Sequence, residues 1–552
     1  MPFVVHHPMA APVAAPGSAP ASLQTLPSEL LCLILDNLVL APLPTGSRRH
    51  LPIPYYTNRG ALLNLCLTSR RLYNFATPLL YHNIVVASSP QCAALFHTLL
   101  YSPHLRRCPR TFASLAPLNS PDDDEDAYQF FERLTFSRNP RFFHGGLYLD
   151  DQAKEVVKRL SMSHGETSGH VYTRSRDFTQ HAVAGAMLLM PDIQDMLFEL
   201  SQHTDYTFFM NDDCIIFRKA LGSPTPSWGT PLSSLHTLRL QSDPDIAGFK
   251  ADAGMLAILI PELFHAPNLR QLDFYGDEGN YTHHWERSLD AMVAYPEWFW
   301  GFLGKVVDLK LLKSQAAPST VVQLLAHCHS LDHLTWTFRQ EAWSSMRDLP
   351  DMSLDKALKP VARKLKSLHL ESYSVGFGWD EDAAEMWDLL EVYQIEMYET
   401  VSTLHNFVLL ENLTIDMMTL FGPCHRQRLR DCAADLSSLL PPHLTRLELI
   451  ERSYNDTYEY YKTVGPHDHW LGNILSKFAQ TCKVEQRQLR HFVLRVFPPG
   501  RTTDGVVQGF RSKGGILELR SRFFEAGVHL DWCWEQVERL PLPIGRDRDW
   551  RS

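Results

Sequence analysis

The stretch KLKSLHL, at residues 364–370, carries the pattern that decides the fold, because its leucines have the spacing L-x-x-L-x-L. Side chains two residues apart point to the same face of a strand, so Leu368 and Leu370 predict a short strand with one buried face. The first leucine of the pattern, Leu365, is expected to anchor the turn before that strand.

This spacing recurs ten times when other apolar residues are allowed, and its middle positions are Leu134, Met196, Leu238, Leu272, Leu309, Leu334, Leu368, Leu413, Leu447 and Phe492. The shortest separation is 25 residues, from Leu309 to Leu334, and the longest is 62, from Leu134 to Met196. Regular leucine-rich repeats run about 20–29 residues, so these units are longer and irregular.

Helical patterns precede several copies, for example at residues 255–263 and 319–328. A helix–strand unit cannot bury its apolar face alone, so neighbouring units are expected to stack. The sequence therefore predicts an α/β solenoid of parallel strands with outer helices. This repeat domain is expected to cover residues 87–540, with its last unit near FFEAGVHLDW at residues 523–532. The alternative is an ordinary α/β domain whose buried strands happen to match the spacing.

A different pattern lies upstream, in LPSELLCLILDNL at residues 26–38. Pro27 suits the first helical position and Glu29 the first turn. One apolar helical stripe is formed by Leu30, Leu31, Ile34, Leu35 and Leu38. A Pro- and Gly-containing loop is expected over residues 41–60, followed by a second helix over 61–76 that Pro78 stops, and by a short strand in LLYHNIVV.

Residues 23–86 resemble an F-box, the N-terminal helical domain of many fungal F-box proteins. The opening of the family is matched by Leu26, Pro27, Glu29, Leu30, Ile34, Leu35 and Leu38, and its second part by Leu65, Leu67, Ser69, Arg70 and Leu72. The segment from Thr77 to Tyr81 is similar to the exit of the family's third helix. The chain departs from the family in its long link over residues 39–60 and in having Leu72 where the family often has Trp.

The resemblance implies a non-catalytic subunit that recognises substrates for a Skp–cullin–F-box ubiquitin ligase. A Skp-type adaptor, joined to a cullin scaffold, would dock on Leu26, Pro27, Glu29, Leu30, Ile34, Leu38, Leu67, Leu72 and Pro78. An unknown substrate protein would bind the repeat domain. Two alternatives remain: a leucine-rich-repeat scaffold for protein–protein interaction without ligase association, and an enzyme whose site is assembled across loops.

Composition and charge exclude several classes of function. The formal net charge of the 552-residue chain is −10, and its basic residues do not cluster, which argues against a nucleic-acid partner. No apolar run approaches the roughly 20 residues that cross a bilayer, so no membrane association is expected. The ten cysteines lack CxxC spacing, which indicates free thiols in the cytoplasm or nucleus. Residues 1–22, rich in Ala and Pro, and residues 541–552 are interpreted as tails.

Catalytic and cofactor motifs are missing from the sequence, and His327, Cys328 and His329 are too close in sequence to converge on a metal. We therefore expect no cofactor and no metal. Two aromatic segments are weak candidates for substrate contact, with core packing or an exposed insertion as the simpler explanation. Their candidate residues are Trp298, Trp300, Tyr454 and Tyr458.

Overall fold

The structure is a computed structural model, and the residues that it describes fall into many segments separated by gaps. They are residues 23, 25–39, 42–43, 45, 51, 53–115, 149–165, 176–200, 232–242, 266–275, 301–314, 318–338, 353–372, 400–421, 436–452, 470–486, 488–497 and 515–534.

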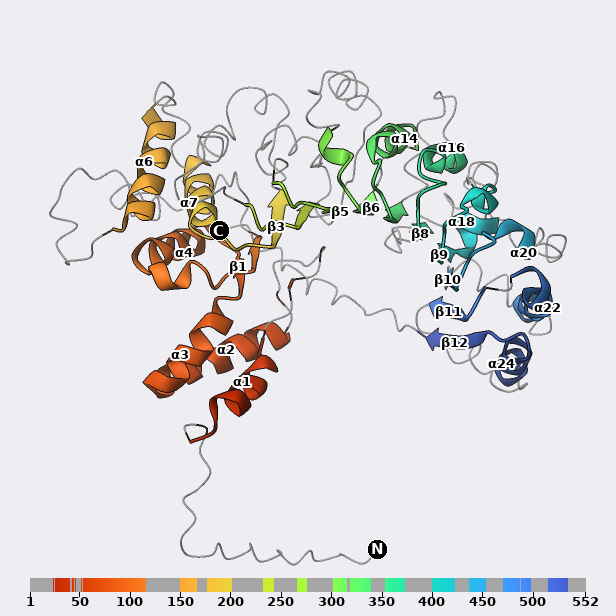
Figure 1. The fold of residues 1–552 in the computed structure, drawn as a ribbon, viewed down its shortest axis with the longest axis horizontal. Helices are drawn as coiled ribbons and strands as arrows, with labels where there is room; N and C mark the ends of the chain where they lie inside the picture. The colour runs from red at the N-terminus through yellow and green to blue at the C-terminus, as the bar shows by residue number, and fades with distance from the viewer. Residues whose placement is uncertain are drawn as a thin grey trace, which may run out of the picture.

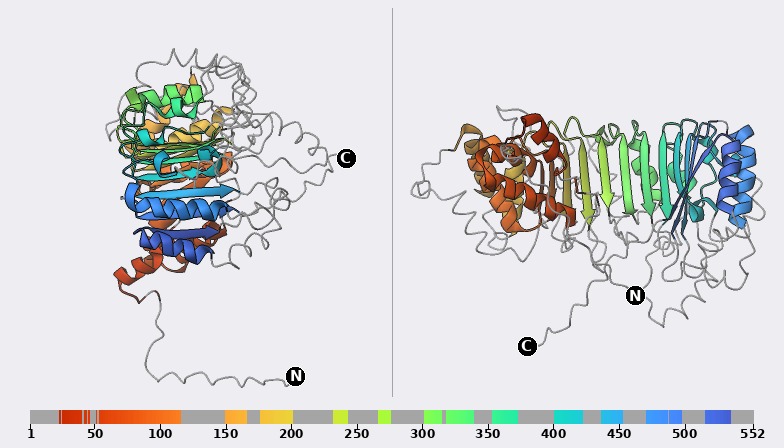
Figure 2. Two further views of the ribbon diagram at one scale, coloured as in Figure 1. Left: turned by 90° about the vertical axis from the view of Figure 1, so that its right-hand side faces the viewer. Right: turned by 90° about the horizontal axis from the view of Figure 1, so that it is seen from below.

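Within these residues a single sheet of twelve strands runs the length of the molecule, and every strand is parallel to the next one in the chain. The sheet curves into an arch with the strands on its inner side (Figures 1 and 2). The strands are β1 (Asn83–Val86), β2 (Thr111–Ser114), β3 (Asp195–Leu200), β4 (Thr237–Ser242), β5 (Gln271–Tyr275), β6 (Asp308–Ser314), β7 (His333–Phe338), β8 (Ser367–Ser372), β9 (Asn412–Asp416), β10 (Arg446–Arg452), β11 (His491–Phe497) and β12 (His529–Trp534).

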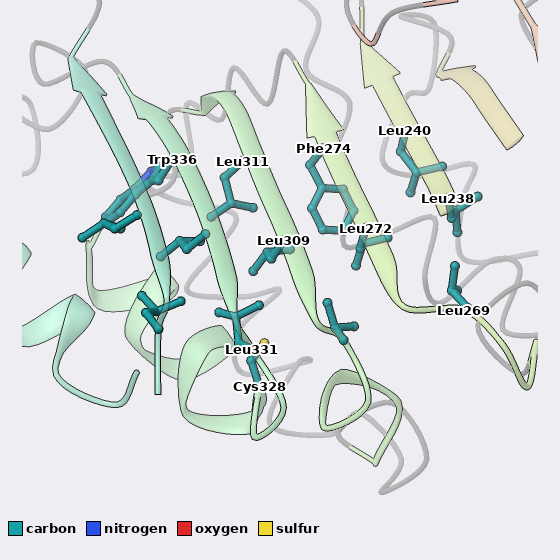
Figure 3. Packing of buried hydrophobic residues seen from close by; sticks show 14 of the residues in the cluster. Leu238, Leu240, Leu269, Leu272, Phe274, Leu309, Leu311, Cys328, Leu331 and Trp336 are labelled. Atoms are coloured by element: carbon teal, nitrogen blue, oxygen red, sulfur yellow. The ribbon is translucent and has the colours of Figure 1, made fainter. Parts of the chain in front are cut away.

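The register explains why the L-x-x-L-x-L spacing recurs. Its nine described middle residues pair laterally in one unbroken row: Met196, Leu238, Leu272, Leu309, Leu334, Leu368, Leu413, Leu447 and Phe492. Ile84 and Phe112 extend the row at one end and Leu530 extends it at the other. Each member is at most 5% exposed. Figure 3 shows part of this row and of the next one, with Leu272, Leu309 and Trp336 on the side that faces the helices. Neighbouring units therefore share one continuous core.

The turn before each strand is also repeated. The carbonyl oxygen of Asp332, for example, accepts hydrogen bonds from the backbone N–H groups of Lys366 and Ser367 in the next unit, at 2.9 and 3.0 Å. The apolar residue that opens each spacing lies inside this turn, and Leu331 and Leu365 are completely buried. The anchor role predicted for Leu365 is thus confirmed.

The helices beside the sheet line the outer side of the arch (Figure 1). Between β1 and β3 they are α4 (Ser89–Tyr101), α6 (Asp151–Gly165) and α7 (Arg176–Leu188), with the short 3-10 helix η1 (Pro103–Leu105). Further along lie α14 (Pro318–His327), α16 (Leu354–Leu358), η2 (Leu404–Asn406), α18 (Met417–Phe421), α20 (Leu436–Leu439), α22 (Trp470–Glu485) and α24 (Gly515–Glu525). The predicted α/β arrangement of parallel strands with outer helices is confirmed.

Most of the predicted repeat copies can be checked. Nine of the ten copies lie on strands β3 to β11, and the helix predicted over 319–328 is α14. The copy at Phe131, Leu134 and Phe136 and the helix predicted over 255–263 lie outside the described residues. Strand β2 was missed, because Phe112 lies in a segment that lacks the leucine spacing.

Three helices precede the arch and project from its end below β1 (Figure 1). They are α1 (Ser28–Asp36), α2 (Ile53–Thr68) and α3 (Arg70–Leu80), and we call them the helical unit. The loop predicted over 41–60 was too long, because α2 begins at Ile53. The single helix predicted over 61–76 is wrong, because the chain is extended at Ser69, which caps α3.

Two prolines also differ from expectation. Pro27 precedes α1 in an extended conformation, with ψ 147°, and its carbonyl oxygen accepts the hydrogen bond of the Leu31 N–H at 3.0 Å. Pro78 lies inside α3 and does not end it. Among the described helices, none is both long and apolar enough to span a bilayer.

Candidate protein-docking surfaces

The helical unit has a small core of its own. Leu31, Leu35 and Leu72 are at most 1% exposed, and they pack against one another between α1 and α3. The Ser69 hydroxyl accepts a hydrogen bond from the Leu72 N–H at 3.2 Å. Arg71 donates from Nη2 to the Leu26 carbonyl oxygen at 2.6 Å, which ties the residues before α1 to α3. These contacts hold α1 and α3 together through their inner sides.

The outer sides of the three helices carry most of the exposed large apolar side chains in the described part of the chain. Eight lie on the helical unit or just before it, each at least 41% exposed: Leu23, Leu30, Leu33, Ile34, Tyr56, Leu63, Leu67 and Tyr73. The described residues of the arch contribute four: Val408, Leu409, Val484 and Phe524. Such a concentration on a small unit is typical of a protein–protein interface.

The spacing of these residues makes stripes. On α1, Leu30 and Ile34 are one turn apart, with Leu33 beside them, while Leu31 and Leu35 face the small core. Helix α1 is therefore apolar on two sides, and such a helix is suited to pack against two surfaces at once. In the described part of the chain, α3 covers one side, and the other side is exposed.

Helix α2 has a stripe of the same kind. Tyr56, Leu63 and Leu67 follow its exposed side at spacings of seven and four residues. Leu67 is the most exposed of the three, at 79%.

The predicted adaptor-binding residues are only partly brought together on this surface. Pro27, Glu29, Leu30, Ile34, Leu67 and Pro78 are exposed, and Leu26 is half-buried. Leu38 is half-buried and packs against the small core. Leu72 is a correction: it is 1% exposed and belongs to that core. Its side chain is needed between α1 and α3, so it stabilises the unit and cannot contact a partner directly.

Sequence reasoning missed Leu33, Tyr56, Leu63 and Tyr73. Leu33 lies between Leu31 and Ile34 of the predicted stripe. It follows Leu30 by three residues, so a stripe drawn through the exposed side of the helix would have included it. Tyr56 was assigned to the loop, and the early start of α2 is what places it in line with Leu63.

The inner face of the arch is a second candidate surface, and its character changes along the sheet. Side chains alternate between the two faces of a strand, so the residues between the buried rows point into the arch. On β1 to β3 these residues are apolar: Val85, Ala113 and Leu197. From β4 onward the same row is mostly polar, beginning with Arg239, Asp273 and Lys310.

Ion pairs join neighbouring strands across this polar part. Arg239 Nη2 lies 2.7 Å from Asp195 Oδ1, and Lys310 Nζ lies 3.5 Å from Asp273 Oδ2. Burial raises the pKa of Asp195, an effect that the Arg239 guanidinium opposes. Near the other end, Arg495 Nη2 lies 2.6 Å from Glu448 Oε1. Fixed charges of both signs suit recognition of a polar partner more than burial of an apolar one.

The four residues proposed for substrate contact, Trp298, Trp300, Tyr454 and Tyr458, lie outside the described residues. Among the residues that the structure does describe, no cluster of His, Cys, Asp and Glu could hold a metal ion. Burial raises the pKa of the Cys328 thiol, and likewise that of Cys482, to about 12. Neither thiol can act readily as a nucleophile near neutral pH.

In comparisons with known proteins, no family model matches the chain and no curated protein matches it significantly. Its function is therefore inferred from the two surfaces.

Proposed function

We propose that the protein is the substrate-recognition subunit of a Skp–cullin–F-box ubiquitin ligase. The helical unit would dock on a Skp-type adaptor that is bound to a cullin, and the arch would hold a substrate protein. In this role the chain itself performs no chemistry.

The observation that carries this proposal is the exposed apolar surface of the helical unit. Burying one leucine side chain is worth about 1.5–3 kcal/mol, so the exposed leucines and isoleucine of α1 and α2 together represent a large unused driving force for association. Leu30 and Ile34 are also residues through which the N-terminal segment resembles an F-box.

The division of the molecule supports the same proposal. The helical unit projects from one end of the arch, and the arch offers its inner face to a second partner (Figure 1). A receptor that joins a common adaptor to variable substrates needs these two separate surfaces. A leucine-rich-repeat scaffold without a ligase is the second candidate, because the arch alone would serve it, but that function leaves the exposed leucines without a role.

Co-purification with a Skp-type adaptor tests the proposal. The full chain, co-expressed with the adaptor, should elute from size exclusion as a one-to-one complex. Leu67→Asp should abolish this complex, because the change removes apolar contact area and would bury a charge in the interface. Leu67 is 79% exposed in the free chain, so folding should not suffer.

A matched control is Phe524→Asp, since Phe524 is 81% exposed on α24, at the opposite end of the arch (Figure 1). This variant should keep the complex. If the wild-type chain forms no complex, or if Leu67→Asp binds as well as Phe524→Asp, the adaptor role is wrong and the scaffold function is favoured.

A further inference from the structure

The chain between α1 and α2, which we call the link, contacts the inner face of the arch. Leu43 is 5% exposed and packs against Ala113, Leu115 and Leu197 at the β2 and β3 end of the sheet. Leu51, two residues before α2, packs against the same cluster. Parts of the link therefore lie on the sheet rather than on the helical unit.

Two polar contacts extend this docking beyond the apolar cluster. Arg239, on β4, donates a hydrogen bond from Nη1 to the carbonyl oxygen of Leu43. The hydroxyl of Thr45 donates to Oδ2 of Asp273, on β5, at 3.1 Å. Leu43 and Thr45 therefore contact two adjacent strands on the inner face.

Two charged side chains beneath the link are buried while the link is in place. Arg239 is 6% exposed and Asp273 is 3% exposed, although both point to the inner face. Asp273 is also held by Lys310, at 3.5 Å, and by the Gln271 side-chain amide, which donates to Oδ1 at 3.1 Å. The contacts to Lys310 and Gln271 do not involve the link, so they hold the Asp273 carboxylate in position for a ligand.

We propose that this section of the inner face is a binding site for a short protein segment, and that the link, through Leu43 and Thr45, is its resident occupant. The site recognises a large apolar side chain, which packs against Ala113, Leu115 and Leu197. It also recognises the backbone carbonyl of that residue at Arg239, and an unmodified Ser or Thr hydroxyl two residues later at Asp273.

A substrate would displace the resident segment. Calling the displacing protein a substrate rests on the proposed function, whereas the site itself does not. Both ends of the link remain tethered to helices, and a short tether gives the resident segment an effective concentration of about millimolar. A free segment of equal affinity therefore binds weakly to the wild-type chain, and it binds well once the resident segment is disabled.

Fluorescence anisotropy with a labelled peptide of residues 39–51, VLAPLPTGSRRHL, tests the proposal on the full-length chain. The peptide should bind a Leu43→Asp chain at least about tenfold more tightly than the wild-type chain, since the variant's own link no longer competes. Two control peptides should not bind that chain: one carrying Leu43→Asp, and one phosphorylated at Thr45, whose phosphate would face the Asp273 carboxylate.

Equally weak binding of the peptide to both chains overturns the proposal, provided that the variant unfolds at the same temperature as the wild type. Equal binding of the phosphorylated peptide overturns the assignment of Asp273. If Leu43→Asp does not fold, Leu43→Ala combined with Thr45→Ala takes its place, with the same expected result. Adaptor co-purification separates this proposal from the ligase function. The Leu43→Asp chain should bind the adaptor as well as the wild-type chain does. If the wild-type chain does not bind the adaptor, the ligase function alone is refuted.

Discussion

Replacing Leu368 by aspartate should disrupt the arch, whereas replacing its neighbour Ser367 should not. Leu368 is 1% exposed, and it is flanked in the apolar row by Leu334 and Leu413, each also 1% exposed. Ser367 is the preceding residue of the same strand, with its side chain on the inner face. The pair of variants therefore tests the register of the sheet with one chemical change.

The cost of Leu368→Asp can be worked out from this burial. Losing a buried leucine costs about 2 kcal/mol, and enclosing a carboxyl group without a partner adds about 3 kcal/mol or more. The total of about 5 kcal/mol equals the lower limit of a typical domain's stability. The units on both sides of β8 pack against it, so the loss of β8 should destabilise both of them.

Thermal unfolding followed by circular dichroism, together with limited proteolysis, measures the outcome. Leu368→Asp should lose the cooperative transition and become sensitive to protease within the arch. Ser367→Asp should change the free energy of unfolding by no more than about 0.5 kcal/mol, as is usual for surface changes. Comparable damage from both variants, or an unchanged transition in Leu368→Asp, would refute the assignment of the two faces.

Two further predictions concern packing and reactivity. Gly185→Ala should lower the free energy of unfolding by about 1–2 kcal/mol, because the new Cβ would clash with Cε2 of the buried Phe96. Gly60→Ala, whose new Cβ would have nothing within 4 Å, should raise the free energy of unfolding by up to about 1 kcal/mol. Equal effects of the two variants on the melting temperature would contradict this packing of α7 on α4. At pH 8, the buried Cys328, whose pKa is raised to about 12, should react with iodoacetamide far more slowly than the exposed Cys533. Peptide mass spectrometry measures the two rates, and the reverse order would show that Cys328 is accessible.

The sequence was most informative where the structural signal is local. The leucine spacing located strands β3 to β11, because a buried strand and its anchored turn are specified by a few neighbouring residues. Strand β1 was expected within LLYHNIVV, but the first four residues of that segment complete α3 and the turn after it. The β-branched and aromatic composition of the segment did not distinguish the end of a helix from the start of a strand.

The sequence by itself predicted an α/β fold of parallel strands with outer helices, preceded by apolar helices, because periodicity shows which residues share a face. Only the tertiary structure decided which apolar residues remain uncovered. On α1, Leu31 and Leu35 meet α3, whereas Leu30 and Ile34 are left exposed. All four belong to one predicted stripe, and nothing in their spacing separates the covered pair from the uncovered one.

The place of the link was likewise decided by the tertiary structure alone. Leu43 and Thr45 stand in a Pro-containing stretch without periodicity, which predicts only a loop. Their partners, Arg239 and Asp273, lie 196 and 228 residues further along the chain. Contacts of this range depend on how the arch places the inner face of β4 and β5 beside the link, and no local pattern in the sequence records that geometry.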